Sequence, residues 1–228
     1  MTPLQDLLGR VDTITFDCYG TLIDWKEGLS RSFQAMFGTG IESRLDELFD
    51  IYIPLEAQVE GEPYRGYRQV LEEVSVRLAH QLGVELPDDH VGVLAQTLPT
   101  WPIFADTNDA LVRLKRRYRL GVLSNIDHDL FAATASRFPI TFDFVVTAQD
   151  VRSYKPDPNH FHRMLEQHGD TATTLHVAQS LFHDGVPAQA LGLAFVWINR
   201  YKEMNRTAVQ PLAEFDDLCS LADQACNS

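Results

Sequence analysis

The sequence predicts an α/β fold: a three-layer Rossmannoid core around a parallel, doubly wound sheet, with a helical subdomain inserted after the first strand. In the first and last parts of the chain, short β-branched or apolar runs that end in polar residues alternate with segments of helical spacing. Such alternation is typical of parallel sheets with crossover helices. Residues 25–99 show helical spacing throughout and no convincing strand. A chain of 228 residues with 45% hydrophobic content is long enough for both parts.

Five runs are predicted to form the strands. Residues 11–16 (VDTITF) are β-branched and lead into the acidic turn DCYGT, as expected of a buried strand that delivers side chains at its carboxyl end. In open parallel sheets, ligands bind outside the carboxyl ends of the strands. The other predicted strands are residues 120–123, 144–147, 175–178 and 195–198.

Helical spacing fills the segments between the strands and the insertion. The predicted domains are a catalytic core of residues 1–24 and 100–228, and a helical cap of residues 25–99, which would cover the strand ends and exclude water. The predicted helices are residues 106–117, 130–138, 159–168 and 187–191 in the core, and residues 30–37, 45–58, 67–81 and 90–98 in the cap.

The composition argues against several kinds of partner. A net charge of −13 without any basic run disfavours nucleic acid, because phosphate-backbone binding relies on clustered Lys and Arg. No run of about 18 apolar residues occurs, and the first ten residues lack the pattern of a secretion signal, so neither a membrane span nor export is predicted. Three unpatterned cysteines fit reduced thiols. We therefore expect a cytoplasmic protein that acts on a small molecule.

Asp17 is the predicted nucleophile. It directly follows the first strand, Gly20 permits a sharp turn there, and Thr21 adds a hydroxyl and a backbone N–H. A lone aspartate at a strand end is more often a turn or capping residue, so the other strand ends decide between the two interpretations.

Polar residues at the other strand ends favour catalysis. Ser124 and Asn125 end the second strand, Lys155 follows the third and Asp184 lies beyond the fourth. An ammonium group keeps a desolvated carboxylate ionised, which is the role expected of Lys155. The alternative interpretation of Lys155 is a solvated surface lysine. Asp184 is expected to position Lys155, to hold a metal or to activate water, and its alternative is a helix N-cap. The carboxyl ends of the strands should bring these side chains to one rim.

These motifs resemble the haloacid dehalogenase superfamily over nearly the whole chain. The matching segments, in the family's order, are FDCYGTLIDW around Asp17, VLSN at Ser124, SYKPDP at Lys155 and HVAQSLFHD ending at Asp184. The insertion is similar to the family's cap of the first type. The resemblance implies an aspartyl-enzyme ester: Asp17 attacks the substrate, a leaving group departs, and water hydrolyses the ester.

Two positions point away from phosphate esters. Phosphatases of the family carry a second aspartate where this chain has Tyr19, and a tyrosine with a pKa of about 10 is a weak substitute for the acid that an alkoxide leaving group needs. They also carry an acidic magnesium ligand where this chain has Gln179. The turn is instead similar to that of the L-2-haloacid dehalogenases of type II, which use no metal. We therefore expect no cofactor; Mg²⁺, held by Asp17 and Asp184, is expected only of a phosphatase.

The resemblance to these dehalogenases has three departures. Where those enzymes have an arginine in the cap, this chain has Asp50 or Ile51. Where they have a tyrosine after the Lys-Pro motif, it has Phe161, and where they have a Ser-x-Asn motif, it has Gln179-Ser180. The long motifs are also similar to a sister group that includes a hydrolase of azetidine-2-carboxylate. Displacement of halide from the 2-position of a small carboxylic acid is the predicted reaction. The alternatives are C–N hydrolysis, a Mg-dependent phosphatase and a catalytically idle binding protein.

Further residues are predicted to shape the pocket and to serve the water step. Tyr19, Trp25 and Trp101 are candidates for an apolar lining, with core packing as the alternative for each, while Asn125, Gln179 and Ser180 are expected to contact the substrate. Asp184 is the first candidate base and His183 the second. Cys18 is expected to pack away from the site. Arg65 or Arg68 would replace the missing cap arginine, and the chain is expected to be a monomer or a homodimer.

Overall fold

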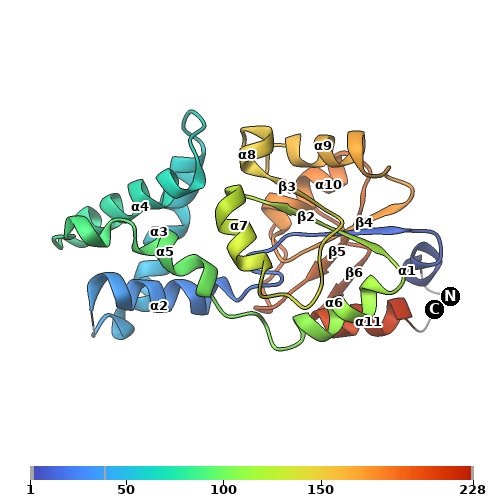
Figure 1. Ribbon diagram of the computed structural model, residues 1–228, viewed down its shortest axis with the longest axis horizontal. Helices are drawn as coiled ribbons and strands as arrows, with labels where there is room; N and C mark the ends of the chain where they lie inside the picture. Colours follow the sequence, from blue (N-terminus) through green and yellow to red (C-terminus); the bar gives the residue numbers. More distant parts are fainter. Residues whose placement is uncertain (1–2, 39, 227–228) are drawn as a thin grey trace. The chain divides into compact units, whose positions relative to one another are not determined.

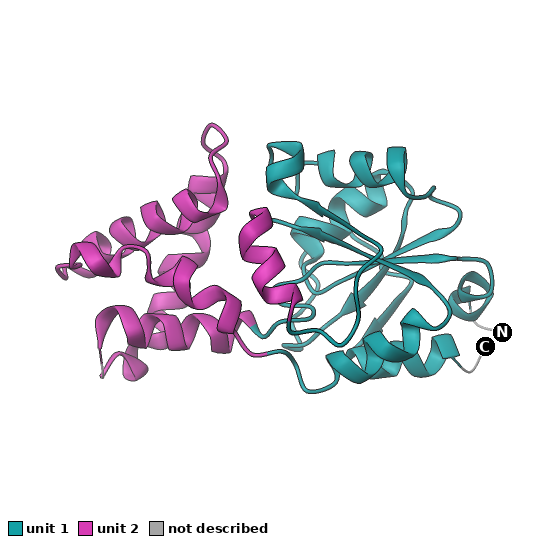
Figure 2. Ribbon diagram, in the orientation of Figure 1, with its two compact units in different colours: residues 1–24, 103–125, 137–228 teal, residues 25–102, 126–136 magenta. Residues whose placement is uncertain are grey.

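The computed structural model describes residues 3–38 and 40–226 and divides the chain into two compact units. The sheet unit comprises residues 1–24, 103–125 and 137–228, and the helical unit comprises residues 25–102 and 126–136 (Figure 2). Residues 100–102 and 126–136, which the sequence analysis assigned to the core, thus group with the helical unit.

The described part of the sheet unit holds six strands in the order β3-β2-β1-β4-β5-β6, all paired in parallel. The predicted parallel α/β fold is confirmed. The last strand was not predicted, because its three residues are only partly buried and lie at the sheet edge, where little apolar character is needed. The strands are β1 (Thr13–Phe16), β2 (Arg119–Ser124), β3 (Phe144–Thr147), β4 (Thr174–Ala178), β5 (Ala194–Ile198) and β6 (Ala213–Phe215).

Helices cover both faces of this sheet, which gives the three layers (Figure 1). Helix α11 was not predicted; it packs against α6 with its apolar face buried. One layer contains α1 (Pro3–Leu8), α6 (Thr107–Lys115) and α11 (Leu218–Cys226), and the other contains α8 (Ala148–Val151), α9 (Asn159–Gln167) and α10 (Val186–Ala190).

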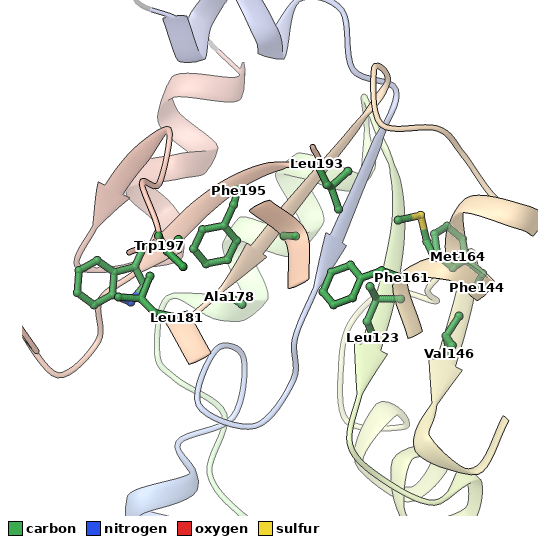
Figure 3. Packing of buried hydrophobic residues seen from close by; sticks show 12 residues of the cluster. Leu123, Phe144, Val146, Phe161, Met164, Ala178, Leu181, Leu193, Phe195 and Trp197 are labelled. Atoms are coloured by element: carbon green, nitrogen blue, oxygen red, sulfur yellow. The ribbon is translucent and has the colours of Figure 1, made fainter. Parts of the chain in front are cut away.

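A continuous apolar cluster joins the second helical layer to the sheet (Figure 3). Helix α9 contributes Phe161 and Met164, which repeat at helical spacing on its buried face. Strands β2 to β5 contribute six more members, including Leu123 and Phe195, and the remaining four lie on α10, the turn before it and loops. This packing holds the carboxyl ends of the central strands rigidly, which is what a functional site at that edge requires.

The helical unit begins directly after the first strand's turn. One carboxylate stabilises helix α4 (Tyr67–Leu82): Asp127 accepts hydrogen bonds from the backbone N–H groups of Tyr67 and Arg68, both at 2.9 Å, and so satisfies free donors at the start of that helix. The helices are α2 (Trp25–Phe37), α3 (Leu45–Glu60), α4 (Tyr67–Leu82), α5 (Val93–Thr97) and α7 (His128–Ala135), with 3₁₀ turns at Ile41–Arg44, Asp88–His90 and Leu98–Thr100. Across residues 3–38 and 40–226, none of the helices has the length and apolar character of a membrane span.

Trp101 packs in the core of the helical unit. Its side chain is buried, and its indole Nε1 donates to Ser32 Oγ at 3.0 Å. The ring lies directly over Gly28 of α2, so that a Cβ atom at this glycine would overlap the ring. The glycine is therefore required by close packing and not by backbone conformation.

We expect Gly28→Ala to lower the free energy of unfolding by about 2 kcal/mol, because the added methyl group forces the buried indole out of its site. Urea unfolding measures the effect. Gly61→Ala is the matched control at the end of α3, where a Cβ atom would meet only backbone oxygens at 3.4 Å. Equal stability of the two variants would contradict the packing argument.

Candidate active site

A buried carboxylate–ammonium–carboxylate cluster lies at the carboxyl edge of the sheet. Asp17 follows β1, and its Oδ1 lies 3.0 Å from Lys155 Nζ. The same Nζ lies 2.6 Å from Asp184 Oδ1. The exposed fractions of Asp17, Lys155 and Asp184 are 8%, 2% and 0%. The structure thus brings together three residues that are separated in the sequence, and Lys155 is not a solvated surface lysine.

The Lys155 ammonium uses all three of its protons within this cluster. Besides the two carboxylates, it donates to the carbonyl oxygen of Leu123 at 2.9 Å. Burial by itself lowers the pKa of Lys155, but Asp17 and Asp184 outweigh it and raise the pKa above its ordinary value. The ammonium is therefore charged at neutral pH and holds both carboxylates.

The Asp17 carboxylate is held at both oxygens. Thr21 Oγ1 donates to Oδ2 at 3.0 Å and accepts from the backbone N–H of Gln179 at 2.9 Å. Gly20 has a φ of 103°, which favours glycine and permits the turn between Asp17 and Thr21. Burial raises the pKa of Asp17 and so does Asp184, while Lys155 and Thr21 oppose the rise. The carboxylate is oriented, partly desolvated and paired with a cation.

Asp184 lies on a π-helical turn, Leu181–Gly185, that is capped by Ser180. The residue that caps α10 is Gly185, so Asp184 is not a helix cap. Its Oδ1 accepts from Lys155 and lies 3.0 Å from His176 Nε2. Burial would raise the pKa of Asp184, but Lys155 and His176 lower it to about 2.

The second strand ends in two residues with different surroundings. The Asn125 side chain accepts from the Lys155 backbone N–H at 2.7 Å and donates to the Lys155 carbonyl at 3.1 Å, so it fixes the loop that carries the ammonium. Ser124 Oγ is buried and has no hydrogen-bond partner among the described residues. A buried hydroxyl without a partner is a candidate for contact with a ligand. Next to the cluster, burial raises the pKa of the Cys18 thiol, which is fully buried, as expected of a packed residue.

The predicted substrate-contacting residues have more varied positions. Gln179 reaches the cluster through its backbone N–H, while its side chain donates to Glu203 at 3.1 Å. Ser180 Oγ accepts from the His183 N–H and lies 3.0 Å from His183 Nδ1, so it stabilises its own turn. Tyr19 is half-buried in the turn after Asp17.

Other predicted pocket residues belong to the helical unit. The Trp25 ring packs edge-on against Phe49 at 5.7 Å. Arg65 pairs with Glu62 at 2.5 Å and Arg68 with Asp129 at 2.7 Å. A role of Trp25, Trp101 or either arginine in substrate binding stays a prediction.

Two residues of the cluster were not predicted. His176, in the middle of β4, contacts Asp184, and Thr15 Oγ1 of β1 lies 2.8 Å from His176 Nδ1. The two residues are register partners in neighbouring strands. A signal was present for His176, because an imidazole stands between Leu175 and Val177 in a buried strand.

The cluster does not suit a magnesium ion. A hard divalent cation requires about six oxygen ligands, and the described cluster offers two carboxylates, Asp17 and Asp184, each with one oxygen already on the Lys155 ammonium. In the described residues, no group of three or more His, Cys, Asp or Glu side chains could hold a metal. We therefore assign no step to a metal.

The fold and the cluster define an α/β enzyme core with its polar residues at the carboxyl edge of the sheet. The family model for haloacid dehalogenase-like hydrolases matches residues 11–181, and the chain belongs to this family. The predicted family membership and the assignment as a hydrolase are confirmed.

Relatives with known names cover most of the chain. An (S)-2-haloacid dehalogenase of Pseudomonas sp. (strain YL) is 29% identical over 205 residues, covering 85% of this chain and 87% of that protein. An (S)-2-haloacid dehalogenase of Pseudomonas putida is 27% identical over 195 residues, covering 84% and 86%. The solved structure of L-2-haloacid dehalogenase from Xanthobacter autotrophicus with chloropropionic acid covalently bound has a TM-score of 0.81 at 18% identity, and the match covers 93% of this chain and 97% of that one. At that identity the likeness shows the fold.

Proposed function

We propose that this hydrolase displaces halide from the 2-position of a small 2-haloacid through an ester at Asp17. The observation that carries the proposal is the buried cluster, in which Lys155 and Thr21 orient the Asp17 carboxylate. Residue 19 is a tyrosine, so the turn lacks a carboxylic acid that would protonate an alkoxide, and a halide needs no proton to leave. The named relatives are 2-haloacid dehalogenases, which supports the same substrate class.

In the first step, an oxygen of Asp17 attacks the carbon that bears the halogen. A carbon–oxygen bond forms, and the halide leaves with the bonding electron pair. Lys155 keeps Asp17 ionised before the attack. The Ser124 hydroxyl, which has no partner within residues 3–38 and 40–226, is available to the substrate carboxylate or to the departing halide.

In the second step, water adds to the carboxyl carbon of the Asp17 ester. Asp184 accepts the proton of this water at Oδ2, which has no hydrogen-bond partner among the described residues. The tetrahedral intermediate then releases the 2-hydroxy acid, which takes the proton from Asp184. The second proton of the water passes from the Asp17 carboxyl to bulk water, which restores the carboxylate with one oxygen from the water.

The test combines substrate panels with isotope labelling. We expect halide release from one or more 2-haloacids that is insensitive to chelator, and no phosphate release from a panel of phosphate esters. After a single turnover in H₂¹⁸O, mass spectrometry should find the label in the peptide that contains Asp17. Chelator-sensitive phosphate release, or ring opening of azetidine-2-carboxylate without halide release from any haloacid, would replace the proposed substrate class.

A further inference from the structure

His176 is a buried residue beside Asp184 that has no role in the two proposed reaction steps. Its side chain lies in the middle of the sheet with no exposed surface. The ring contacts Phe161 edge-on at 5.0 Å between centroids and lies 6.1 Å from the ring of Phe195. Both ring nitrogens have polar neighbours: Nε2 lies 3.0 Å from Asp184 Oδ1, and Nδ1 lies 2.8 Å from Thr15 Oγ1.

The hydrogen bonds fix which nitrogen carries a proton. A carboxylate only accepts, so Nε2 is the protonated nitrogen that donates to Asp184. In the neutral ring, Nδ1 then accepts from the hydroxyl of Thr15. Asp184 thereby selects the tautomer, Thr15 holds the other ring nitrogen, and the aromatic neighbours hold the plane of the ring.

The two oxygens of Asp184 have different surroundings because of this contact. Oδ1 takes both donors, the Lys155 ammonium at 2.6 Å and the His176 N–H at 3.0 Å. Oδ2 is buried and has no partner in the described part of the chain. Without His176, the carboxylate would be free to rotate about its Cβ–Cγ bond and to present either oxygen to the ammonium.

We propose that His176, oriented by Thr15, is a positioning residue that keeps Asp184 Oδ2 free for the water that hydrolyses the Asp17 ester. This inference rests on the proposed function. One O–H bond of the water breaks, its proton moves to Oδ2, and the oxygen bonds to the carboxyl carbon of Asp17. When the ester bond breaks, this proton passes from Oδ2 to the product alkoxide, and the second proton of the water leaves the Asp17 carboxyl to bulk water. His176 neither gains nor loses a proton in this sequence.

The proposal predicts that His176 acts on ester hydrolysis and not on ester formation. His176→Phe keeps an aromatic ring against Phe161 and Phe195 but removes the donor. With 2-chloropropionate as the probe in single-turnover experiments, we expect this variant to form the Asp17 adduct at a rate close to that of the wild type. Hydrolysis of the adduct should slow by about 10- to 100-fold, part of the usual contribution of a general base, so that the adduct accumulates in the mass spectrum. His176→Gln, which places an amide N–H near the Nε2 position, should restore much of the hydrolysis rate.

Thr15→Val tests the orienting hydroxyl with a matched control. Thr174 Oγ1 is equally buried in the neighbouring strand and has no hydrogen-bond partner among the described residues, so Thr174→Val removes a hydroxyl of the same size that orients nothing. We expect slower adduct hydrolysis in Thr15→Val and an unchanged rate in Thr174→Val. Equal rates in the two variants would contradict the role of Thr15.

A third measurement is independent of any substrate. In ¹⁵N-labelled wild-type protein, NMR of the imidazole nitrogens should find the proton of His176 on Nε2. A neutral ring protonated on Nδ1 would overturn the inference. So would wild-type rates of adduct hydrolysis in His176→Phe, or equal slowing of adduct formation and hydrolysis. Failure of the proposed function has a different signature, because then the wild type itself forms no adduct with the probe.

Discussion

Asp17→Asn is expected to abolish halide release from 2-haloacids, with a fall of at least about 10⁴-fold in turnover. An amide oxygen is a far weaker nucleophile than a carboxylate. Ion chromatography measures the halide, and intact-protein mass spectrometry should find no adduct on the variant. Asp12→Asn is the control, because Asp12 precedes the same strand but is exposed.

The same substitution is expected to leave the thermal stability at pH 7 equal to or above that of the wild type. Burial raises the pKa of Asp17 above its ordinary value of 3.8, so the ionised form is disfavoured in the folded protein. The stability that this group contributes is present below pH 3.8 and is lost as the pH rises through its folded pKa. An amide does not ionise and avoids this loss. Wild-type turnover, or a large drop in Tm, would show that Asp17 is mainly a structural residue.

The strand ends of the sheet unit could be located from the sequence because buried parallel strands have a simple pattern. A β-branched or apolar run that stops at polar residues specifies both the strand and the edge at which its side chains emerge, as at Asp17 and Ser124. The order of the elements then brings Lys155 and Asp184 to the same edge. The parts that escaped prediction lack this pattern: β6 is short and half-exposed, and α7 has a core-like position in the sequence although it groups with the helical unit.

The orientation of individual atoms in the cluster could not be predicted in this way. The contact of His176 with Asp184 depends on a π-helical turn, and its contact with Thr15 depends on the register of β4 against β1, neither of which a local pattern specifies. The packing of Trp101 also escapes a local pattern, because the contacts of its indole with Gly28 and Ser32 exist only in the folded helical unit.

Lys155→Met is expected to lower both activity and stability at neutral pH. Removing the ammonium leaves Asp17 and Asp184 buried without their shared cation, which should destabilise the folded state by about 3–5 kcal/mol. Because Lys155 opposes the effect of burial on Asp17, the pKa of Asp17 should rise further, and the carboxyl should be largely protonated where the wild type is active. Turnover should fall by about 10³-fold or more at pH 7.

The pH dependence separates this mechanism from a simple loss of packing. In the wild type, the pKa of Asp184 is lowered from its ordinary value of 3.8 to about 2. The ionised Asp184 therefore stabilises the folded protein at pH values above 3.8, and this contribution is lost only as the pH falls toward 2. In Lys155→Met both carboxyl groups can take up protons as the pH falls, so the stability gap to the wild type, measured by urea unfolding, should narrow from pH 8 to pH 5. The residual activity should instead rise toward alkaline pH, as Asp17 loses its proton.

Lys115→Met is the control, because it removes a partly exposed lysine that pairs with Asp143 on the surface. We expect the free energy of unfolding to change by less than about 1 kcal/mol and the turnover to stay normal. A pH-independent gap for Lys155→Met would mean that the side chain acts through its volume and not through its charge.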